Sequence, residues 1–423
     1  MSLAKGSQLP ILIVGAGPSG LTLAQSLRRL DIPFRLFERD AKTFSRPQGY
    51  RIRLVDGAKS LKAVVPADVA ALFDASCGDV MKGLKRIDAG TGASLGGRPG
   101  GPLAGPPGRA MMGPDPKTVD RGVLRKVLLS GIEDTVEFGK TFDRYEIDED
   151  QECVTAFFDD GTSAKGRFLV GAEGRSSRVR RQYVPDIVRV DTEGCLLFGM
   201  SPITPELSEV LDKAGVVGMC LLEDEKTLPT KAAILMERIL WSPAIRDNMA
   251  KNFADSGVEL PQDYVYWVYA TRRSSLPPPF NSLAAGGDQK AAASAIISLT
   301  TDFSPEIRAV FAAQDPSQTN VFHLISTHPD IKPWTPSKYV TVVGDAITVM
   351  PPTAASGANT ALLNAQQLSN MIEEHREGIT VEAVGKYEEE LRRIATERIS
   401  NSLSAGVGTF GQKPLEECEI IKS

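Results

Sequence analysis

A glycine-rich turn between an apolar strand and a helix is the feature that most constrains this chain. Residues 11–14 read Ile-Leu-Ile-Val, residues 15–20 read Gly-Ala-Gly-Pro-Ser-Gly, and an apolar-periodic run follows at 21–30. A second apolar stretch at 34–37 completes the strand, helix, strand order of a βαβ unit. Glycines in such a turn permit the tight bend, let the backbone approach a pyrophosphate, and let the helix pack on the strand.

The same unit predicts a dinucleotide site. The helix that follows the turn offers unpaired amides and the positive end of its dipole. Glu38 closes the second strand about 20 residues after the turn, where a carboxylate can accept hydrogen bonds from both ribose hydroxyls. Because an acid disfavours a 2′-phosphate, the site suits FAD or NAD and not NADP. The residues assigned to it are Gly15, Gly17, Pro18, Ser19, Gly20, Glu38 and Arg39.

Length and charge predict a globular chain of two lobes. The chain has 423 residues, of which 42% are hydrophobic, an ordinary share for a globular protein. A chain of this length is too long for one simple core. Its net charge of −5 leaves no basic surplus for a phosphate backbone, so we expect no nucleic acid partner. The first ten residues are polar and no apolar run approaches the roughly 18 residues of a membrane span. We therefore expect a cytoplasmic protein.

Cysteines and histidines do not predict a metal site. His323 and His328 lie in a segment that is broken by prolines and has no carboxylate cluster at ligand spacing. The five cysteines have no CxxC spacing and an odd total, which is typical of reduced thiols. Redox chemistry would therefore need an organic cofactor.

The order of patterns predicts that one lobe is inserted into the other. Residues 1–183 form the first part of the nucleotide lobe, with an irregular Gly/Pro-rich excursion at 90–116. Residues 184–326 change to separated apolar strands and form the candidate substrate lobe. Residues 327–423 resume the nucleotide lobe and end in C-terminal helices. The predicted fold class is α/β, a Rossmann-like domain with an inserted domain of mixed β-sheet.

Two further motifs distinguish FAD from NAD. Residues 173–180, Glu-Gly-Arg-Ser-Ser-Arg-Val-Arg, follow an apolar strand and resemble the DGxxSxVR motif of the class A flavoprotein monooxygenases, the para-hydroxybenzoate hydroxylase type. Residues 344–346, Gly-Asp-Ala, and the Gly-Ala-Asn at 357–359 resemble that family's GD motif and the glycine-rich turn after it. With the first turn, these motifs stand in the family's order over residues 15–370. The chain is similar to fungal and bacterial members from secondary metabolism.

The resemblance implies which residues hold the FAD. Asp345, at a strand end, can accept hydrogen bonds from ribityl hydroxyls, and amides at the start of the next helix can stabilise negative charge on the flavin. Arg121 matches the family's arginine that reaches the phosphates and the ribityl chain; the alternative is an ordinary surface arginine in the first turn of a helix. The residues that the resemblance adds are Arg121, Glu173, Gly174, Gly344, Asp345, Pro352, Gly357, Ala358 and Asn359.

Three positions depart from the family's pattern. Glu173 replaces the usual aspartate of the DG motif and keeps its charge with one more methylene. Thr348 stands where a histidine is often found, and Asn364 where an acid is common. None of these changes removes a group that performs oxygen transfer.

Arg51 and Arg53 are the candidate catalytic residues. They lie two apart in a segment that corresponds to the family strand passing the flavin toward the substrate, so they share one face. Either can hold the flavin, the nicotinamide cofactor or a substrate carbonyl; the alternative is two solvated arginines at a strand edge. Met200 aligns with a position where many relatives carry a basic residue beside the substrate. That change favours an apolar or neutral polycyclic substrate.

The resemblance implies an FAD-dependent monooxygenase. NADPH or NADH would reduce the FAD as a transient visitor, and a flavin C4a-hydroperoxide formed with O2 would hydroxylate or epoxidise an aromatic, indole or polycyclic small molecule. No separate nicotinamide-binding unit is visible, in agreement with this cycle. The alternatives are another FAD oxidoreductase (a dehydrogenase, reductase or halogenase) and a non-catalytic FAD-binding protein. No WxWxIP-like halogenase motif occurs. The oligomeric state stays open.

Overall fold

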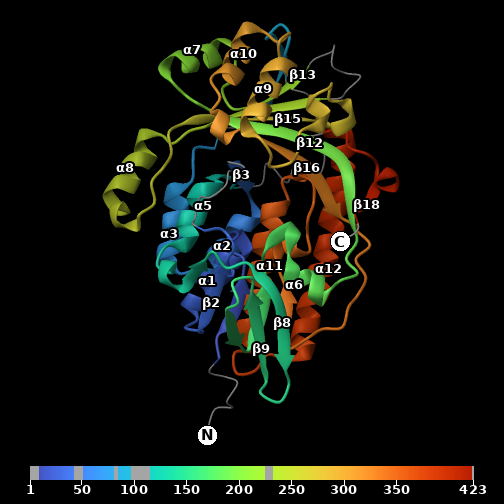
Figure 1. The fold of residues 1–423 in the computed structure, drawn as a ribbon. Coiled ribbons are helices and arrows are strands. Elements are labelled where there is room, and N and C mark those ends of the chain that lie inside the picture. The colour runs from blue at the N-terminus through green and yellow to red at the C-terminus, as the bar shows by residue number, and fades with distance from the viewer. Residues whose placement is uncertain (1–8, 42–50, 81–83, 97–114, 224–231, 422–423) are drawn as a thin grey trace.

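The chain folds into two stacked lobes (Figure 1). A computed structural model describes residues 9–41, 51–80, 84–96, 115–223 and 232–421. The lower lobe holds a parallel sheet covered by helices, and the upper lobe holds a large mixed sheet. The predicted α/β class, with a Rossmann-like domain and a mixed sheet in the second lobe, is confirmed.

A five-stranded parallel sheet forms the centre of the lower lobe. Its strands, in spatial order, are β17 (Val340–Val342), β11 (Phe168–Gly171), β1 (Ile11–Val14), β2 (Phe34–Glu38) and β7 (Val136–Phe138). All four residues of β1 are buried, because helices cover both faces of a parallel sheet and its strands are therefore apolar throughout. The sheet joins segments from both ends of the chain, which brings the turn after β1 close to the turn after β17.

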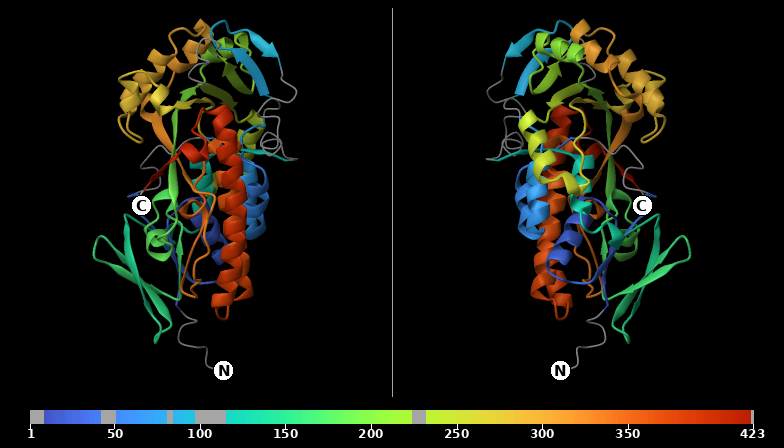
Figure 2. Two further views of the ribbon diagram at one scale, coloured as in Figure 1. Left: turned by 90° about the vertical axis from the view of Figure 1, so that its right-hand side faces the viewer. Right: turned by 90° about the vertical axis from the view of Figure 1, so that its left-hand side faces the viewer.

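Helices pack against this sheet along its length. Figure 2 shows the long α12 running down the lower lobe. The main helices of this lobe are α1 (Pro18–Arg29), α2 (Asp56–Val64), α3 (Ala67–Ser76), α5 (Arg121–Leu129), α6 (Arg178–Tyr183), α11 (Gly357–Glu374) and α12 (Val381–Thr409). A separate antiparallel sheet of β8 (Phe142–Asp148), β9 (Cys153–Phe158) and β10 (Ser163–Gly166) lies at the lower end. Among the described residues, no helix is long and apolar enough to cross a membrane.

The upper sheet provides the roof over the space between the lobes. Its strands, in spatial order, are β16 (Asn320–Thr327), β12 (Arg189–Pro202), β15 (Tyr264–Arg272), β14 (Ala233–Ile239), β13 (Met219–Glu223), β4 (Leu84–Asp88) and β5 (Ser94–Gly96), and β18 (Glu419–Ile421) pairs with β12. The helices α7 (Pro205–Lys213), α9 (Gln289–Leu299) and α10 (Pro305–Ala312) cover its outer face, and α8 (Pro243–Asn252) lies to one side (Figure 1). Trp267 and Phe311 meet edge to face between the sheet and these helices, with ring centroids 5.3 Å apart.

Parts of this sheet differ from the sequence prediction. β4 and β5 come from residues assigned to the nucleotide lobe, and β5 lies within the stretch 90–116 that we expected to be irregular. β18 adds a strand where only helices were expected. Short strands of weak local preference form here because they pair with an existing sheet edge, and tertiary pairing outweighs local propensity. The remainder of the Gly/Pro-rich stretch, 97–114, lies outside the described residues.

A two-stranded ribbon of β3 (Arg51–Leu54) and β6 (Lys117–Asp120) lies between the lobes. The strands are antiparallel, with Arg51 opposite Asp120 and Arg53 opposite Thr118. β6 leads directly into α5, so the ribbon connects the space under the roof with a helix of the lower lobe.

Candidate active site

A cavity of about 1360 Å³ lies between the two lobes. It is bordered by the turn after β1, the N-terminus of α5, the turn after β17 and the inner face of the upper sheet. Ligand pockets for a single small molecule typically occupy about 300–1,000 Å³. The cavity therefore has room for a dinucleotide together with a second molecule.

Most of the predicted site residues border this cavity. Those that do are Gly15, Gly17, Pro18, Ser19, Glu38, Arg39, Arg51, Arg53, Arg121, Glu173, Gly174, Asp345, Pro352, Gly357 and Ala358. Gly20, Gly344 and Asn359 are not part of the lining. Gly20 and Gly344 allow close packing of the elements that line the cavity, and Asn359 holds such elements together by hydrogen bonds.

The glycines of the first turn have different roles. Gly15 has φ +109°, and a Cβ there would lie 2.4 Å from the Ala172 carbonyl oxygen. A Cβ on Gly20 would lie 2.0 Å from the Gly15 carbonyl oxygen, so α1 packs on the turn through this residue. Gly17 has open space around it and caps α1 without a side chain. The first amides of α1 therefore face the cavity, where they can bind an anion.

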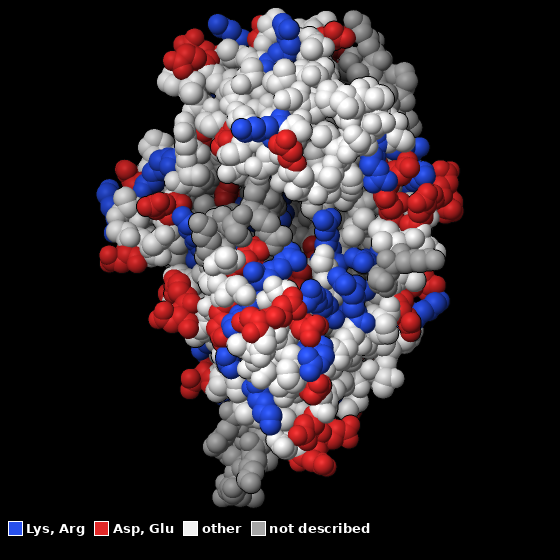
Figure 3. All heavy atoms as spheres, viewed as in Figure 1, with Lys and Arg blue, Asp and Glu red and all other residues white. Residues whose placement is uncertain are grey.

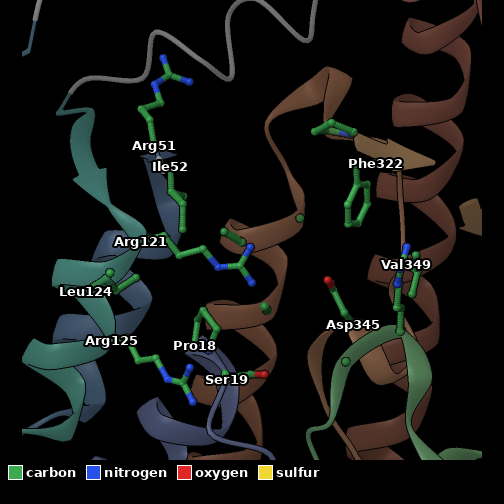
Figure 4. A pocket seen from close by; sticks show the side chains of 18 of the residues that line it. Pro18, Ser19, Arg51, Ile52, Arg121, Leu124, Arg125, Phe322, Asp345 and Val349 are labelled. Atoms are coloured by element: carbon green, nitrogen blue, oxygen red, sulfur yellow. The ribbon is translucent and has the colours of Figure 1, made fainter. Parts of the chain in front are cut away.

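Glu38 lies at the end of β2 with its carboxylate fixed by the backbone. It accepts hydrogen bonds from the amides of Ala16 (2.8 Å) and Asp40 (3.0 Å). The Arg125 guanidinium lies 3.5 Å from Glu38 and 3.8 Å from Asp40. Sequence reasoning missed Arg125, although a helical period places it one turn after Arg121 on the same face of α5. Both arginines point from α5 toward the cavity (Figure 4).

Arg121 and Asp345 face each other across the cavity. Figure 4 shows their side chains extending toward one another from α5 and from the turn after β17. Asp345 is exposed to the cavity but enclosed by surrounding protein atoms. This enclosure raises the pKa of its carboxyl, while Arg121 and Arg175 act in the opposite direction. Desolvation likewise lowers the pKa of Arg121, and Asp345 opposes that shift. A charged pair thus borders the space that a ribityl chain and phosphates would fill.

Glu173 folds back onto the start of α6. Its carboxylate accepts hydrogen bonds from the Ser177 hydroxyl (2.5 Å) and from the amides of Arg178 and Val179 (3.1 Å each). Burial raises the pKa of this carboxyl, and these hydrogen bonds oppose the shift. The longer side chain at this position therefore keeps the charged end within its own loop.

The Asn359 side chain connects α11 with the central ribbon. Its oxygen accepts hydrogen bonds from the amides of Val55 and Gly57 at 2.9 Å, and its nitrogen donates to the carbonyls of Arg53 (3.0 Å) and Ala355 (2.9 Å). This network fixes the N-terminus of α11, where Gly357 and Ala358 border the cavity.

Two of the departures from the family's pattern are buried polar groups. In the described part of the chain, Thr348 Oγ1 and Asn364 Oδ1 have no hydrogen-bond partner. Neither residue borders the cavity.

Arg51 and Arg53 are buried, so the alternative of two solvated strand-edge arginines is wrong. Their side chains are 7% and 5% exposed, and both form ion pairs with Glu237 of β14. Arg53 Nη2 lies 2.5 Å from Glu237 Oε1, and Arg53 Nη1 donates to Thr118 Oγ1 at 3.1 Å. Sequence reasoning missed Glu237, which carries no motif.

The roof of the cavity is mostly apolar. Residues from three adjacent strands of the upper sheet line it: Leu196, Met200, Leu235, Tyr266 and Val268. Met200 of β12 lies opposite Tyr266 of β15, and Tyr266 lies opposite Glu237 of β14. These three side chains therefore lie next to one another on the same face of the sheet. Burial raises the pKa of the Tyr266 hydroxyl to about 12.

These features fit an FAD. The space beside Gly17 would admit a pyrophosphate, the Glu38 carboxylate borders the cavity where it could accept hydrogen bonds from a ribose, and the Arg121 guanidinium could bind the phosphates. Within the described residues, no group of three His, Cys, Asp or Glu side chains is placed to hold a metal ion.

Comparison with known proteins agrees with this fit. Residues 8–53 and 311–402 match the FAD binding domain family. The chain is 35% identical over 437 residues to a dual O-methyltransferase/FAD-dependent monooxygenase of Cercospora beticola, covering 99% of this chain and 48% of the relative. It is 24% identical over 429 residues to an FAD-dependent monooxygenase of Penicillium herquei, covering 98% and 94%. The chain spans about half the length of the dual-function relatives it matches.

Solved structures share the whole architecture. An FAD-containing monooxygenase of Photorhabdus luminescens superposes with a TM-score of 0.75 at 26% identity, over 96% of this chain and 99% of that one. HpxO of Klebsiella pneumoniae, complexed with FAD and uric acid, superposes with a TM-score of 0.71 at 19% identity, over 97% and 91%. Fold and cavity define an FAD-binding protein with the architecture of the class A flavin monooxygenases. The chain is therefore similar to FAD-dependent monooxygenases over its whole described fold and matches the FAD binding domain family in the segments given above.

Proposed function

We propose that this protein uses a nicotinamide cofactor and O2 to hydroxylate or epoxidise an aromatic or polycyclic small molecule. The observation that carries the proposal is a single cavity that borders both the dinucleotide turn and the apolar face of the upper sheet. When bound, FAD accepts a hydride from the reductant and activates O2 for transfer.

The residues of the chain would position the reactants and exclude water. Arg121 and Asp345 would hold the phosphates and the ribityl chain, and the amides of Gly357 and Ala358 would stabilise negative charge on the flavin. The apolar side chains of the roof would keep water away from the reacting atoms and accept a flat ring system. A broad apolar face with one polar corner favours a polycyclic substrate.

Labelled dioxygen tests this proposal. Purified protein that is loaded with FAD is mixed with NADPH and a panel of aromatic and polycyclic compounds under isotopically labelled O2. We expect a product that gains one labelled oxygen atom. Consumption of NADPH with only hydrogen peroxide formed throughout the panel would favour another FAD oxidoreductase. An absence of NADPH consumption would favour a non-catalytic FAD-binding protein.

NADPH is the reductant that the charges around the cavity favour. Arg175, Arg181 and Arg189 lie near one another, and none makes an ion pair with a carboxylate of the described residues. Burial and the neighbouring arginines lower the pKa of Arg189. Figure 3 shows basic side chains gathered along the lower edge of the central hollow. Because the chain is acidic overall, the presence of Arg175 and Arg181 in the cavity lining without an ion-pair partner among the described residues favours a ligand that carries an additional phosphate.

Arg181→Ala is expected to raise the KM for NADPH about 10-fold or more while it changes the KM for NADH little. A hydrogen bond to a charged group contributes about 1.5–3 kcal/mol, and only NADPH carries the extra phosphate. Steady-state kinetics with both nucleotides measure the two KM values. Arg144→Ala is the matched control, because Arg144 pairs with Asp143 and Glu146 on β8, outside the cavity lining. An equal rise for both nucleotides would contradict the assignment.

A further inference from the structure

The central ribbon is bonded to the upper sheet at two points. Arg51 and Arg53 of β3 pair with Glu237 of β14. Asp120 of β6 accepts a hydrogen bond from the Tyr264 hydroxyl of β15 at 2.7 Å. β14 and β15 are neighbouring antiparallel strands, so both contacts reach the same part of the roof.

Each contact continues into an element that borders the cofactor space. Asp120 also caps α5 by accepting the amides of Gly122 (2.8 Å) and Val123 (3.0 Å), directly beside Arg121. The Arg53 carbonyl accepts the Asn359 side chain at the start of α11. The upper sheet is therefore connected by Asp120 to the N-terminus of α5 and by Arg53 to the N-terminus of α11. Both helix N-termini border the cavity.

Glu237 is the only carboxylate among the described residues that pairs with these two arginines. Its side chain is 1% exposed. One oxygen accepts a hydrogen bond from Arg53, and the other lies against Arg51 as an ion pair without an aligned hydrogen bond. Two cations against one anion leave excess positive charge at a corner of the cavity that Arg51 and Arg53 line. Burial and the charge of Arg51 lower the pKa of Arg53, whereas Glu237 raises it.

We propose that Glu237 is a positioning residue that holds Arg51 and Arg53 at the cavity wall and sets the net charge that a flavin experiences there. The acid acts through the arginines, since it does not itself border the cavity. In this arrangement the substrate sheet contributes directly to the electrostatics of the cofactor site. The inference rests on the proposed function only in taking the bound group to be FAD.

The flavin midpoint potential tests the proposal in FAD-loaded protein without O2 or substrate. Reduction adds negative charge to the flavin, so nearby positive charge stabilises the reduced form. Glu237→Gln removes a negative charge and is expected to raise the potential. Arg51→Gln removes a positive charge and is expected to lower it. Glu237→Asp keeps the charge and is expected to return the potential toward that of the wild type.

Asp212→Asn is the matched control. Asp212 pairs with Arg238, the next residue on β14, whose side chain lies on the opposite face of the strand. We expect its potential to equal that of the wild type. Shifts of the same sign in Glu237→Gln and Arg51→Gln, or no shift in either, would overturn the proposal, because disturbed packing alone does not predict opposite signs.

Arg51→Gln keeps the test decisive if Glu237→Gln does not fold, because Glu237 retains its bond to Arg53 in that variant. Arg51→Lys then serves as the charge-preserving comparison. A lowered potential in Arg51→Gln with recovery in Arg51→Lys supports the role of the corner charge, and equal potentials in both contradict it. The midpoint potential is measured without oxygen or substrate. Its result therefore stays valid even if the monooxygenase assay fails.

Discussion

Replacing Arg121 with alanine is expected to lower the affinity for FAD by a factor of about 10 to 150. The substitution removes charge-assisted hydrogen bonds to the phosphates, each of which contributes about 1.5–3 kcal/mol. It also leaves Asp345 facing the cavity without its opposing arginine. Asp345→Ala is expected to act in the same direction, because the ribityl hydroxyls lose their acceptor. Fluorescence titration of the apoprotein with FAD measures both affinities.

Two further variants serve as comparisons for this loss of FAD affinity. Arg53→Ala is expected to lower FAD occupancy less than Arg121→Ala, because the Arg53 guanidinium already forms hydrogen bonds with Glu237 and Thr118. Arg29→Ala removes a partly exposed ion pair with Glu373, and such pairs contribute little. Equal occupancy in all of these variants would show that the cofactor lies elsewhere.

The cofactor side of the site could be predicted because its signals are local. The turn at 15–20 lies between a strand and a helix in the sequence, and Glu38 follows within the same βαβ unit. Arg121 is the first residue of a helix whose cap, Asp120, directly precedes it. Each of these residues is placed by its immediate neighbours, so the sequence pattern carries the necessary information.

The substrate side could not be predicted in the same way. Glu237 reaches Arg51 and Arg53 only when β14 pairs with β15 over the central ribbon, and nothing near residue 237 marks that register. β4 joins the upper sheet by pairing with β13, more than a hundred residues later in the chain. Such contacts depend on the whole fold. The pairing of Arg51 and Arg53 with Glu237 was missed for this reason.

For Asn359, the sequence predicted the position of the backbone but not the direction of the side chain. Its position in a glycine-rich turn at the start of a helix predicts backbone amides near a cofactor, and the turn does border the cavity. The side chain, however, binds β3 and the start of α2. Sequence pattern identified the turn but not the direction of the side chain, because that direction depends on what packs behind it.

Gly20→Ala is expected to destabilise the protein even without FAD. A Cβ at this position would lie 2.0 Å from the Gly15 carbonyl oxygen and 3.2 Å from the Ala172 Cβ. Since the Gly15 carbonyl is part of the backbone and cannot move alone, α1 must shift from the turn, and overpacking of this kind typically costs about 1–3 kcal/mol. We expect a lower melting temperature of the apoprotein and a large loss of FAD affinity, because the amides of α1 move away from the pyrophosphate.

Gly17→Ala is expected to separate these two effects. At Gly17 the nearest atom to an added Cβ is the Ala172 carbonyl oxygen at 4.0 Å, and φ is −80°, so alanine fits without strain. The melting temperature of the apoprotein should therefore stay close to that of the wild type. FAD affinity should still fall about tenfold or more, because the methyl group occupies space through which the backbone meets the pyrophosphate. If Gly17→Ala bound FAD as tightly as the wild type, the pyrophosphate would not approach α1 at this residue, and the turn would serve packing alone.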